Sequence, residues 1–408
     1  MSVISLSTNY ANRFSDKTNN NADSLIEKID FPLLLSSLVL VGLGLVMVAS
    51  SSIAIAERQL SDPLYFFWRQ FSYAAIGIIS AFIVFKIPLN ILQKTGPALI
   101  MLSMILLALV LVPGIGKEVN GSTRWINLGF ISLQVSEFVK LATVIYLAGY
   151  LVRHNEEVRT NLSGFMRPLG LIFIISSLLI FEPDFGAVAV IAMTAMGMLW
   201  LGGASFFQFV FLVLTMGAAL TLAAISSPYR MERLTTFLNP WADPFDSGFQ
   251  LTQALIAFGR GEWFGVGLGS SVQKLFYLPE AHTDFVFAVL AEELGLFSVI
   301  VVISIFCFIV IRALMIGRRA EKRERPFTAF LSYGLGIWLG LQAFINVGVN
   351  MGVLPTKGLT LPLMSYGGSS LIIMCVVIAI LLRADYETRQ FDRKGQNNKK
   401  KVAVGQLW

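Results

Sequence analysis

Apolar runs dominate this 408-residue chain and leave few folds open to it. Hydrophobic residues make up 55% of the sequence and charged residues 14%, whereas about 25% of residues are charged in an ordinary soluble protein. About 20 apolar residues in a row can cross the roughly 30 Å hydrocarbon core of a membrane as a helix. Ten such runs predict an all-α integral membrane protein with ten transmembrane helices, at about 32–56, 67–86, 89–113, 131–152, 167–182, 185–202, 206–227, 285–316, 327–350 and 366–384.

The distribution of Lys and Arg predicts how these helices are oriented. With the N-terminus placed in the cytoplasm, 21 of the 31 basic residues fall in cytoplasmic segments and nine on the opposite side, while Lys140 lies within a span. Cytoplasmic segments carry the excess of basic residues in membrane proteins. We therefore expect both termini in the cytoplasm.

Three regions are expected from the composition. Residues 1–31 form a polar cytoplasmic N-terminal tail, residues 32–384 form the membrane domain, and residues 385–408 form a basic cytoplasmic tail. Within the membrane domain, residues 227–284 form one long external loop between spans seven and eight. The basic run at 399–401 predicts contact with anionic lipid headgroups rather than with nucleic acid, so no nucleic-acid partner is expected.

The long external loop has a pattern of its own. Residues 250–258 are apolar enough to form a short helix at the membrane interface. Five glycines follow within the eleven residues 259–269, which permits tight turns and a close approach of the backbone to a ligand. The spacing fits neither a Walker loop nor a dinucleotide-binding turn, so nucleotide binding is not expected.

The end of this loop, at residues 279–285, places Glu280, His282 and Asp284 together at the start of an apolar run. Removing a carboxylate from water at such a position is costly, so its presence needs a reason. One interpretation is a loop boundary with ordinary solvated charges. The other is a carboxylate that takes part in chemistry.

Two further external segments carry residues of the kind that bind phosphates and sugars. Arg124 and Trp125 lie in the first, and Lys357 and Ser365 lie at the second. Arg and Trp also anchor proteins at membrane interfaces, so anchoring and recognition of a pyrophosphate or sugar are both open for the first pair. With Asp284, these residues suit an amphiphile with phosphates and sugars: cations hold a pyrophosphate and a carboxylate accepts a proton from a hydroxyl group.

Ionisable residues also occur within the predicted spans. Glu137 and Lys140 are three positions apart and can pair on one helix face, and Glu292 and Glu293 lie near the start of the eighth span. Such residues usually face the interior of a bundle or a watery cavity. A structural ion pair and a role in shaping a site are both consistent with the spacing of Glu137 and Lys140.

Three sequence runs resemble the SEDS family (shape, elongation, division and sporulation), and its cell-division members in particular. They are NPWADPFDSGFQLTQALIAFGRGEWFGVGLG at 239–269, YLPEAHTDFVFAVLAEELG at 277–295 and PTKGLTLPLMSYGGSS at 355–370. The resemblance extends over the whole membrane domain.

The resemblance implies a peptidoglycan glycosyltransferase that polymerises lipid II into glycan strands for septal cell-wall synthesis at division. The reaction would take place on the periplasmic face of the bacterial cytoplasmic membrane and release undecaprenyl pyrophosphate. Asp284 would take the proton of the acceptor 4-hydroxyl group, and Arg124 or Lys357, or a divalent cation (Mg²⁺ or Mn²⁺), would offset the charge of the pyrophosphate. The implied partners are lipid II, the nascent glycan strand, a class B penicillin-binding protein and other divisome proteins.

The candidate site therefore has three groups of residues, and the resemblance places Trp125, Gln134, Glu137 and Lys140 on family positions associated with activity. The catalytic candidate is Asp284. The candidates for substrate binding are Arg124, Trp125, Gln134, Glu280, His282, Lys357 and Ser365. The polar residues expected in the cavity are Glu137, Lys140 and Glu293.

Two other functions stay open. A flippase that moves lipid II across the membrane would also use ten spans and polar residues within them, and a non-catalytic divisome scaffold would need only surfaces. A transport path must reach both faces of the membrane. Here the unusual charges lie in the outer loops and the outer halves of the spans, which favours chemistry at the outer face.

Overall fold

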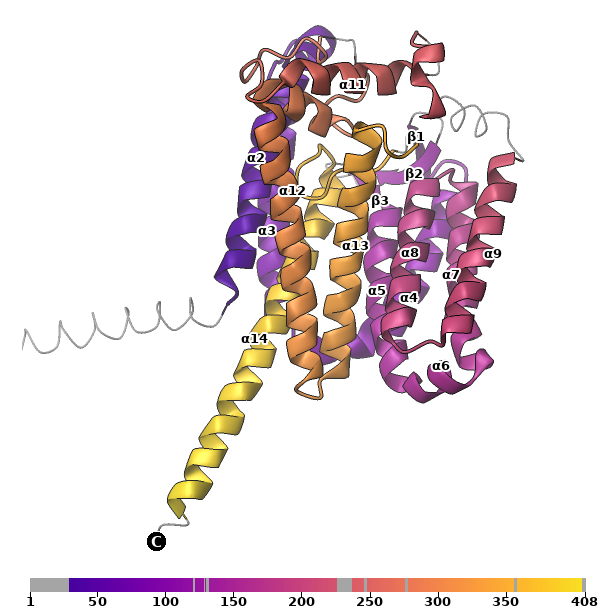
Figure 1. Cartoon of the computed structure of the whole chain (residues 1–408), viewed down its shortest axis with the longest axis vertical. Coiled ribbons are helices and arrows are strands. Elements are labelled where there is room, and N and C mark those ends of the chain that lie inside the picture. The colour runs from indigo at the N-terminus through magenta and orange to yellow at the C-terminus, as the bar shows by residue number, and fades with distance from the viewer. Residues whose placement is uncertain are drawn as a thin grey trace, which may run out of the picture.

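The computed structural model describes residues 29–119, 122–127, 129, 132–225, 237–245, 248–275, 278–355 and 358–405. Each of the ten apolar runs contains a helix (Figure 1). These helices are α2 (Phe31–Leu60), α3 (Tyr65–Lys86), α4 (Leu89–Val110), α5 (Val135–Arg153), α7 (Leu162–Phe181), α8 (Phe185–Leu201), α9 (Phe206–Ile225), α12 (Val286–Glu321), α13 (Pro326–Asn350) and α14 (Gly368–Gly405).

The protein is a multi-pass helical membrane protein by the length and composition of its helices. Within the described ranges, eight helices are long and apolar enough to cross a membrane, and these are α2, α3, α4, α5, α7, α12, α13 and α14. The remaining two apolar stretches, Phe185–Leu201 in α8 and Phe206–Thr215 in α9, are shorter. The ten-span topology with both termini in the cytoplasm therefore stays a prediction.

Helices α5, α13 and α14 form the buried centre of the bundle, whereas α3 and α4 are mostly exposed. Small residues allow close packing between α12 and α13, as the sequence predicts for its Gly336–Gly340 pair. A Cβ atom at Gly336 would lie 2.9 Å from the Cβ atom of Ala313, and one at Gly340 would lie 3.1 Å from Val310.

Short elements cover one end of the bundle, which we call the α11 end. Helix α11 (Phe249–Gly261) lies across this end in Figure 1, and it confirms the short helix predicted in the long loop. The 3₁₀ helix Pro240–Ala242 precedes α11, and the short helix α6 (Asn155–Thr160) lies at the opposite end.

A small antiparallel sheet also lies at the α11 end, and the all-α prediction missed it. Its strands are β1 (Gly116–Val119), β2 (Ser122–Asn127) and β3 (Ser132–Gln134), with β2 in the middle. Trp125 lies opposite Lys117 on β1 and opposite Gln134 on β3. The fourth predicted span therefore begins at Val135 rather than near residue 131, and the sheet leads directly into α5.

The glycine-rich segment after α11 packs against a break in α12. Gly295 interrupts the helical backbone of α12 with φ 74°. The amides of Leu296 and Phe297 donate to the carbonyl oxygens of Glu262 and Trp263 at 2.8 and 3.2 Å. In return, the carbonyl oxygens of residues 292 and 293 accept from the amides of residues 266 and 267, both at 3.0 Å. The close approach that the glycines permit is therefore to the backbone of α12.

Candidate active site

A cavity of about 1210 Å³ lies at the α11 end of the bundle. Its walls come from α3, the β-sheet, α5, the start of α8, α11 and the two segments 279–285 and 358–368. Eight residues predicted from the sequence line it: Arg124, Trp125, Gln134, Glu137, Lys140, Glu280, His282 and Asp284. The fold thus brings into one space most of the side chains that the sequence analysis selected.

Asp284 is fixed by its main chain, two residues before α12 begins. Its carbonyl oxygen accepts hydrogen bonds from the side-chain amides of Asn346 and Asn350, both at 2.9 Å. Asn350 also makes an interhelical bond, because its amide oxygen accepts from the backbone of Ala288 on α12 at 3.1 Å. Asn346 also donates to the carbonyl oxygen of Leu359 at 2.6 Å.

The half-buried carboxylate of Asp284 faces the cavity. Burial and the neighbouring negative charges of Glu280 and Asp184 raise its pKa to about 7, and the Arg124 guanidinium opposes this shift only in part. A pKa near neutrality suits a general base, because the group is available unprotonated and still binds a proton well. The physical cause is the desolvation of charge within a group of like charges.

His282 and Glu280 form the rim beside Asp284. The His282 ring lies between the rings of Phe66 and Tyr366, with centroid distances of 4.7 and 5.4 Å. Burial lowers the pKa of His282, against the opposing effect of Glu280, so the imidazole is neutral at neutral pH. Glu280 has a positive φ of 58°, and its carboxylate accepts from the hydroxyl group of Thr283 at 2.7 Å.

Arg124 joins the β-sheet to the turn between α7 and α8. Its guanidinium donates to the carbonyl oxygens of Glu182 and Pro183 at 3.2 and 2.6 Å, and it lies 3.8 Å from the Asp184 carboxylate. Asp184 also caps α8 by accepting from the amide of Ala187 at 3.1 Å. Arg124 therefore lines the cavity with much of its hydrogen-bonding capacity already used.

Glu182 in the same turn is fully buried, and neither of its carboxylate oxygens has a hydrogen-bond partner within the described residues. Burial and the charge of Asp184 raise its pKa to about 8, with Arg124 opposing. Glu182 is therefore mostly protonated at neutral pH and adds little negative charge to the cavity wall.

Glu137 and Lys140 form the predicted ion pair and also line the cavity. The Lys140 ammonium lies 2.9 Å from Glu137 and 2.8 Å from the amide oxygen of Gln342, and 5.5 Å from the Trp338 ring. Gln342 accepts from the Trp338 indole at 2.9 Å and donates to the carbonyl oxygen of Thr360 at 3.1 Å. The pair therefore ties α5 to α13 through Gln342, and both of its side chains line the cavity.

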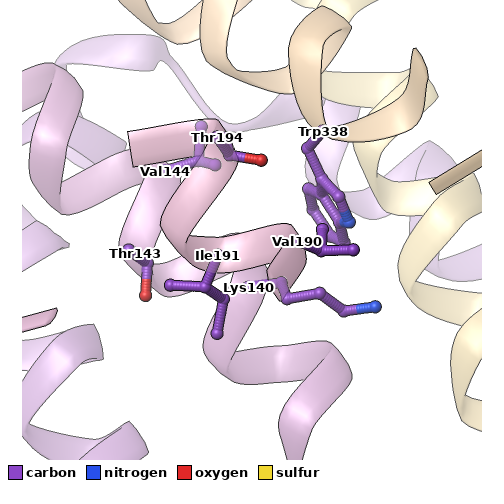
Figure 2. Close-up of a pocket in the computed structure, with 7 residues that line it drawn as sticks. All are labelled: Lys140, Thr143, Val144, Val190, Ile191, Thr194 and Trp338. Atoms are coloured by element: carbon purple, nitrogen blue, oxygen red, sulfur yellow. The ribbon is translucent and has the colours of Figure 1, made fainter. Parts of the chain in front are cut away.

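A small recess lies against Lys140, as Figure 2 shows. Trp338 and Lys140 border it together with Thr143, Val144, Val190, Ile191 and Thr194. The recess is mainly apolar, so the polar lining of the cavity ends near the Glu137–Lys140 pair.

Two predicted residues lie outside the cavity, and the position of a third is not described. Glu293 is buried outside the cavity, where it pairs with Lys274 at 2.9 Å and accepts from the hydroxyl group of Ser50. Ser365 is buried and accepts from the amide of Leu361 at 2.8 Å, so it supports the turn before α14. Lys357 lies outside the described residues.

Asp184 and Arg69 are among the cavity residues that the sequence did not single out. Asp184 was visible only as part of a short break between two apolar runs. Arg69 lies on α3, where its guanidinium donates to the hydroxyl groups of Tyr65 and Tyr73 at 3.1 and 2.7 Å. The available signal was the spacing, because tyrosines four residues before and four residues after an arginine share its helix face.

Within the described residues, no group of three or more His, Cys, Asp or Glu side chains has the geometry to hold a metal ion. The described side chains therefore do not by themselves form a protein cage for a divalent cation.

Residues 31–390 match the family described as cell cycle proteins, which groups FtsW, RodA and SpoVE. The chain belongs to this family. It is 59% identical over 360 residues to the probable peptidoglycan glycosyltransferase FtsW of Nitrosococcus halophilus, covering 88% of this chain and 93% of that protein. It is 53% identical to the corresponding protein of Coxiella burnetii, covering 87% of this chain and 96% of that one. This is the SEDS family that the three sequence runs resemble.

Solved structures of family members share the fold. A chain from a peptidoglycan synthase complex, described as coordinating polymerization and crosslinking, superposes with a TM-score of 0.72 at 28% identity and covers 89% of this chain and 99% of that one. The rod shape determining protein RodA of Thermus thermophilus gives a TM-score of 0.65 at 26% identity, with 88% of this chain and 96% of that chain covered.

Proposed function

We propose that this member of the FtsW/RodA/SpoVE family is a peptidoglycan glycosyltransferase that polymerises lipid II. Relatives at 50–59% identity carry the name of this activity. The observation that carries the proposal is the position of Asp284, whose carboxylate faces a cavity of about 1210 Å³. That volume is above the roughly 300–1,000 Å³ typical of small-molecule sites, and it leaves room for sugar groups.

In the proposed reaction, Asp284 accepts the proton of the acceptor 4-hydroxyl group as its oxygen attacks the anomeric carbon of the donor. A carbon–oxygen bond forms between the two sugars, and the bond between the anomeric carbon and the pyrophosphate oxygen breaks. The pyrophosphate leaves on its polyprenyl chain. Arg124 and Lys140 supply positive potential at the cavity wall as this charge develops.

The aromatic residues of the cavity are assigned to the substrate. Trp125 lines the cavity with a flat ring that can provide apolar contact for a sugar face, and His282 lines it beside Asp284. Gln134 is held by the sheet, with its backbone amide donating to the hydroxyl group of Ser369 at 3.1 Å. Glu280 lies next to Asp284 and acts on it mainly through charge.

The proposed setting is the bacterial cytoplasmic membrane at the division septum. The protein would cross the membrane ten times, with both termini in the cytoplasm and the cavity facing the periplasm. The excess of basic residues on the other side of the predicted topology supports this orientation. The proposed partners are a class B penicillin-binding protein and other divisome proteins, and the similarity to a chain of a peptidoglycan synthase complex supports the first of these.

The cavity favours an enzyme over a flippase. A transport path needs polar groups that reach both faces of the membrane. In the described part of the chain, the cavity lining passes from Glu137 and Lys140 to an apolar recess bordered by Val144, Val190 and Ile191. The polar surface thus ends inside the bundle.

The decisive experiment follows fluorescent lipid II with purified protein and its cognate transpeptidase. Asp284→Asn should reduce the rate of polymerisation by at least about 100-fold, because a positioned base contributes about that much. Glu156→Gln is the matched control, since this exposed glutamate lies on α6 at the opposite end. Polymerisation by Asp284→Asn at the rate of the unchanged protein would refute the assignment. Translocation of lipid II in liposomes, without polymerisation, would support the flippase.

A further inference from the structure

Arg69 is held in the cavity wall by two phenol groups. It lies on the first turns of α3, half-buried, and its guanidinium donates to the hydroxyl groups of Tyr65 at 3.1 Å and Tyr73 at 2.7 Å. The guanidinium carbon also lies 5.6 and 5.7 Å from the centres of these two rings. Tyrosines on both sides therefore fix the direction of the arginine.

The position of Arg69 relative to the membrane helices is equally well defined. Buried Tyr73 packs on the first residue of α14, where a Cβ atom added to Gly368 would lie 2.7 Å from the Tyr73 ring. Tyr73, Gly368 and Arg69 all line the cavity. The cation is thus held near the junction of α3 and α14 and lines the cavity.

Arg69 differs in its partners from Lys140 and Arg124, which also line the cavity. Lys140 pairs with Glu137 at 2.9 Å, and Arg124 lies 3.8 Å from Asp184. Among the described residues, Arg69 has no carboxylate partner, because both of its side-chain bonds go to neutral hydroxyl groups. A guanidinium has five N–H donors, so the two phenols orient Arg69 without neutralising it or using all its donors.

The outer face of α3 is suited to a lipid chain. Apolar side chains of this helix, among them Phe71, Ile79 and Phe82, are exposed on the surface of the bundle. Arg69, in the first turns of the same helix, lines the cavity. An amphiphile could therefore keep its hydrocarbon chain against α3 in the membrane while its phosphates reach the guanidinium.

We infer that Arg69 binds the pyrophosphate group of a polyprenyl-linked sugar donor and keeps hold of it as the leaving group. This inference rests on the proposed function and names a further residue for its substrate. The planar guanidinium forms paired hydrogen bonds to phosphate oxygens, which an ammonium group cannot match. Arg69 is then better placed to bind the pyrophosphate than Arg124, whose donors are already engaged.

The test measures binding without turnover. Full-length protein carrying Asp284→Asn is purified in a neutral detergent, and its Kd for farnesyl pyrophosphate is measured by calorimetry. Adding Arg69→Gln should weaken binding by about 10-fold or more, the amount expected for losing a charged hydrogen-bonding partner. Arg69→Lys keeps the charge but loses the planar fork, so its Kd for farnesyl pyrophosphate should lie between that of the protein with Arg69 and that of the Arg69→Gln variant.

The controls separate this role from a general effect of charge. Lys86→Gln removes a cation from the last turn of α3, where Lys86 is exposed over the Phe82 ring, and it should leave the Kd unchanged. Farnesyl monophosphate should bind more weakly than the pyrophosphate in the unchanged background. Phosphatidylglycerol micelles should compete poorly, whereas strong competition would make Arg69 an anchor for anionic lipid headgroups and overturn the inference.

The outcomes also separate this inference from the proposed function. Arg69→Gln protein that keeps its thermal stability and binds farnesyl pyrophosphate with undiminished affinity would overturn the role of Arg69, whatever the polymerisation assay shows. If Arg69→Gln unfolds, the folded Arg69→Lys variant provides the test. A Kd for farnesyl pyrophosphate equal to that of the protein with Arg69 would count against a role of the planar guanidinium. Absence of lipid II polymerisation in the unchanged protein with its partner would refute the proposed function, while the binding result would still stand.

Discussion

The backbone carbonyl oxygen of Asp284 accepts a hydrogen bond from the side-chain amide of Asn350 at 2.9 Å. Asn350 is fully buried in the last turn of α13, and its amide oxygen accepts from the backbone of Ala288. The Asn350 side chain therefore bonds both to Asp284, two residues before α12, and to Ala288 in the first turn of that helix. The position of the Asp284 carboxylate is set by α13 as well as by its own loop.

Asn350→Ala should therefore impair catalysis without touching the substrate. The change removes one hydrogen bond from the Asp284 carbonyl oxygen and one from the Ala288 amide, which keep their bonds to Asn346 and to the carbonyl oxygen of Phe285, and each lost bond costs about 0.5–1.5 kcal/mol. We expect a lower thermal unfolding temperature in detergent and a lower kcat for lipid II polymerisation, with a smaller effect on KM. Asn90→Ala, at an exposed position on α4, is the control. An unchanged kcat would show that Asn350 does not position Asp284.

The pKa of Asp284 predicts how activity depends on pH. Because the carboxylate must be unprotonated to act as a base and its pKa in the free protein is about 7, kcat/KM should rise with pH and reach half its plateau near pH 7. Glu280→Gln removes a neighbouring negative charge, which lowers the pKa of Asp284 and should move this half-point to lower pH. The half-point is measured in initial rates across pH, with Glu156→Gln as the control. A half-point that stays fixed or moves upward would contradict the assignment.

The sequence predicted a helix in each of the ten apolar runs, because a long apolar run specifies a helix in a membrane by itself, and eight of these helices are long and apolar enough to cross one. The Glu137–Lys140 pair was also predictable, since residues three apart on a helix are neighbours. The clustering of Glu280, His282 and Asp284 was already present in the chain order. These features are local, and local spacing determines them.

The features that the sequence did not predict depend on contacts between distant segments. Arg124 could be recognised as a candidate, but its bonds to Glu182 and Pro183 follow from the fold alone. Glu293 was expected to line the cavity, and the pairing with Lys274 takes it elsewhere. The three strands are three to six residues long, too short for a clear alternating pattern.

Gly265, in the glycine-rich segment, occupies a position that tolerates no side chain. Gly265 has φ 78°, and a Cβ atom there would lie 2.2 Å from the carbonyl oxygen of Glu293 on α12. Gly265→Ala should therefore separate the segment from the break in α12 and lower the stability by more than about 2 kcal/mol, from backbone strain and the clash together. Thermal unfolding measures the loss. Gly170→Ala on α7 meets no atom within 4 Å and should not lower the unfolding temperature; equal behaviour of both variants would disprove the close contact.

The Glu137–Lys140 pair allows its structural role and its role in the site to be separated. Lys140→Met leaves the Glu137 carboxylate buried without its partner, which costs about 3–5 kcal/mol. Adding Glu137→Gln removes the uncompensated charge, so the double variant should recover most of the lost thermal stability. If the pair serves only to join α5 to α13, polymerisation should recover with it. We expect stability to return while polymerisation stays low, because Lys140 also provides positive charge to the cavity in which the pyrophosphate leaves. Recovery of both properties in the double variant would make the pair purely structural and remove Lys140 from the site.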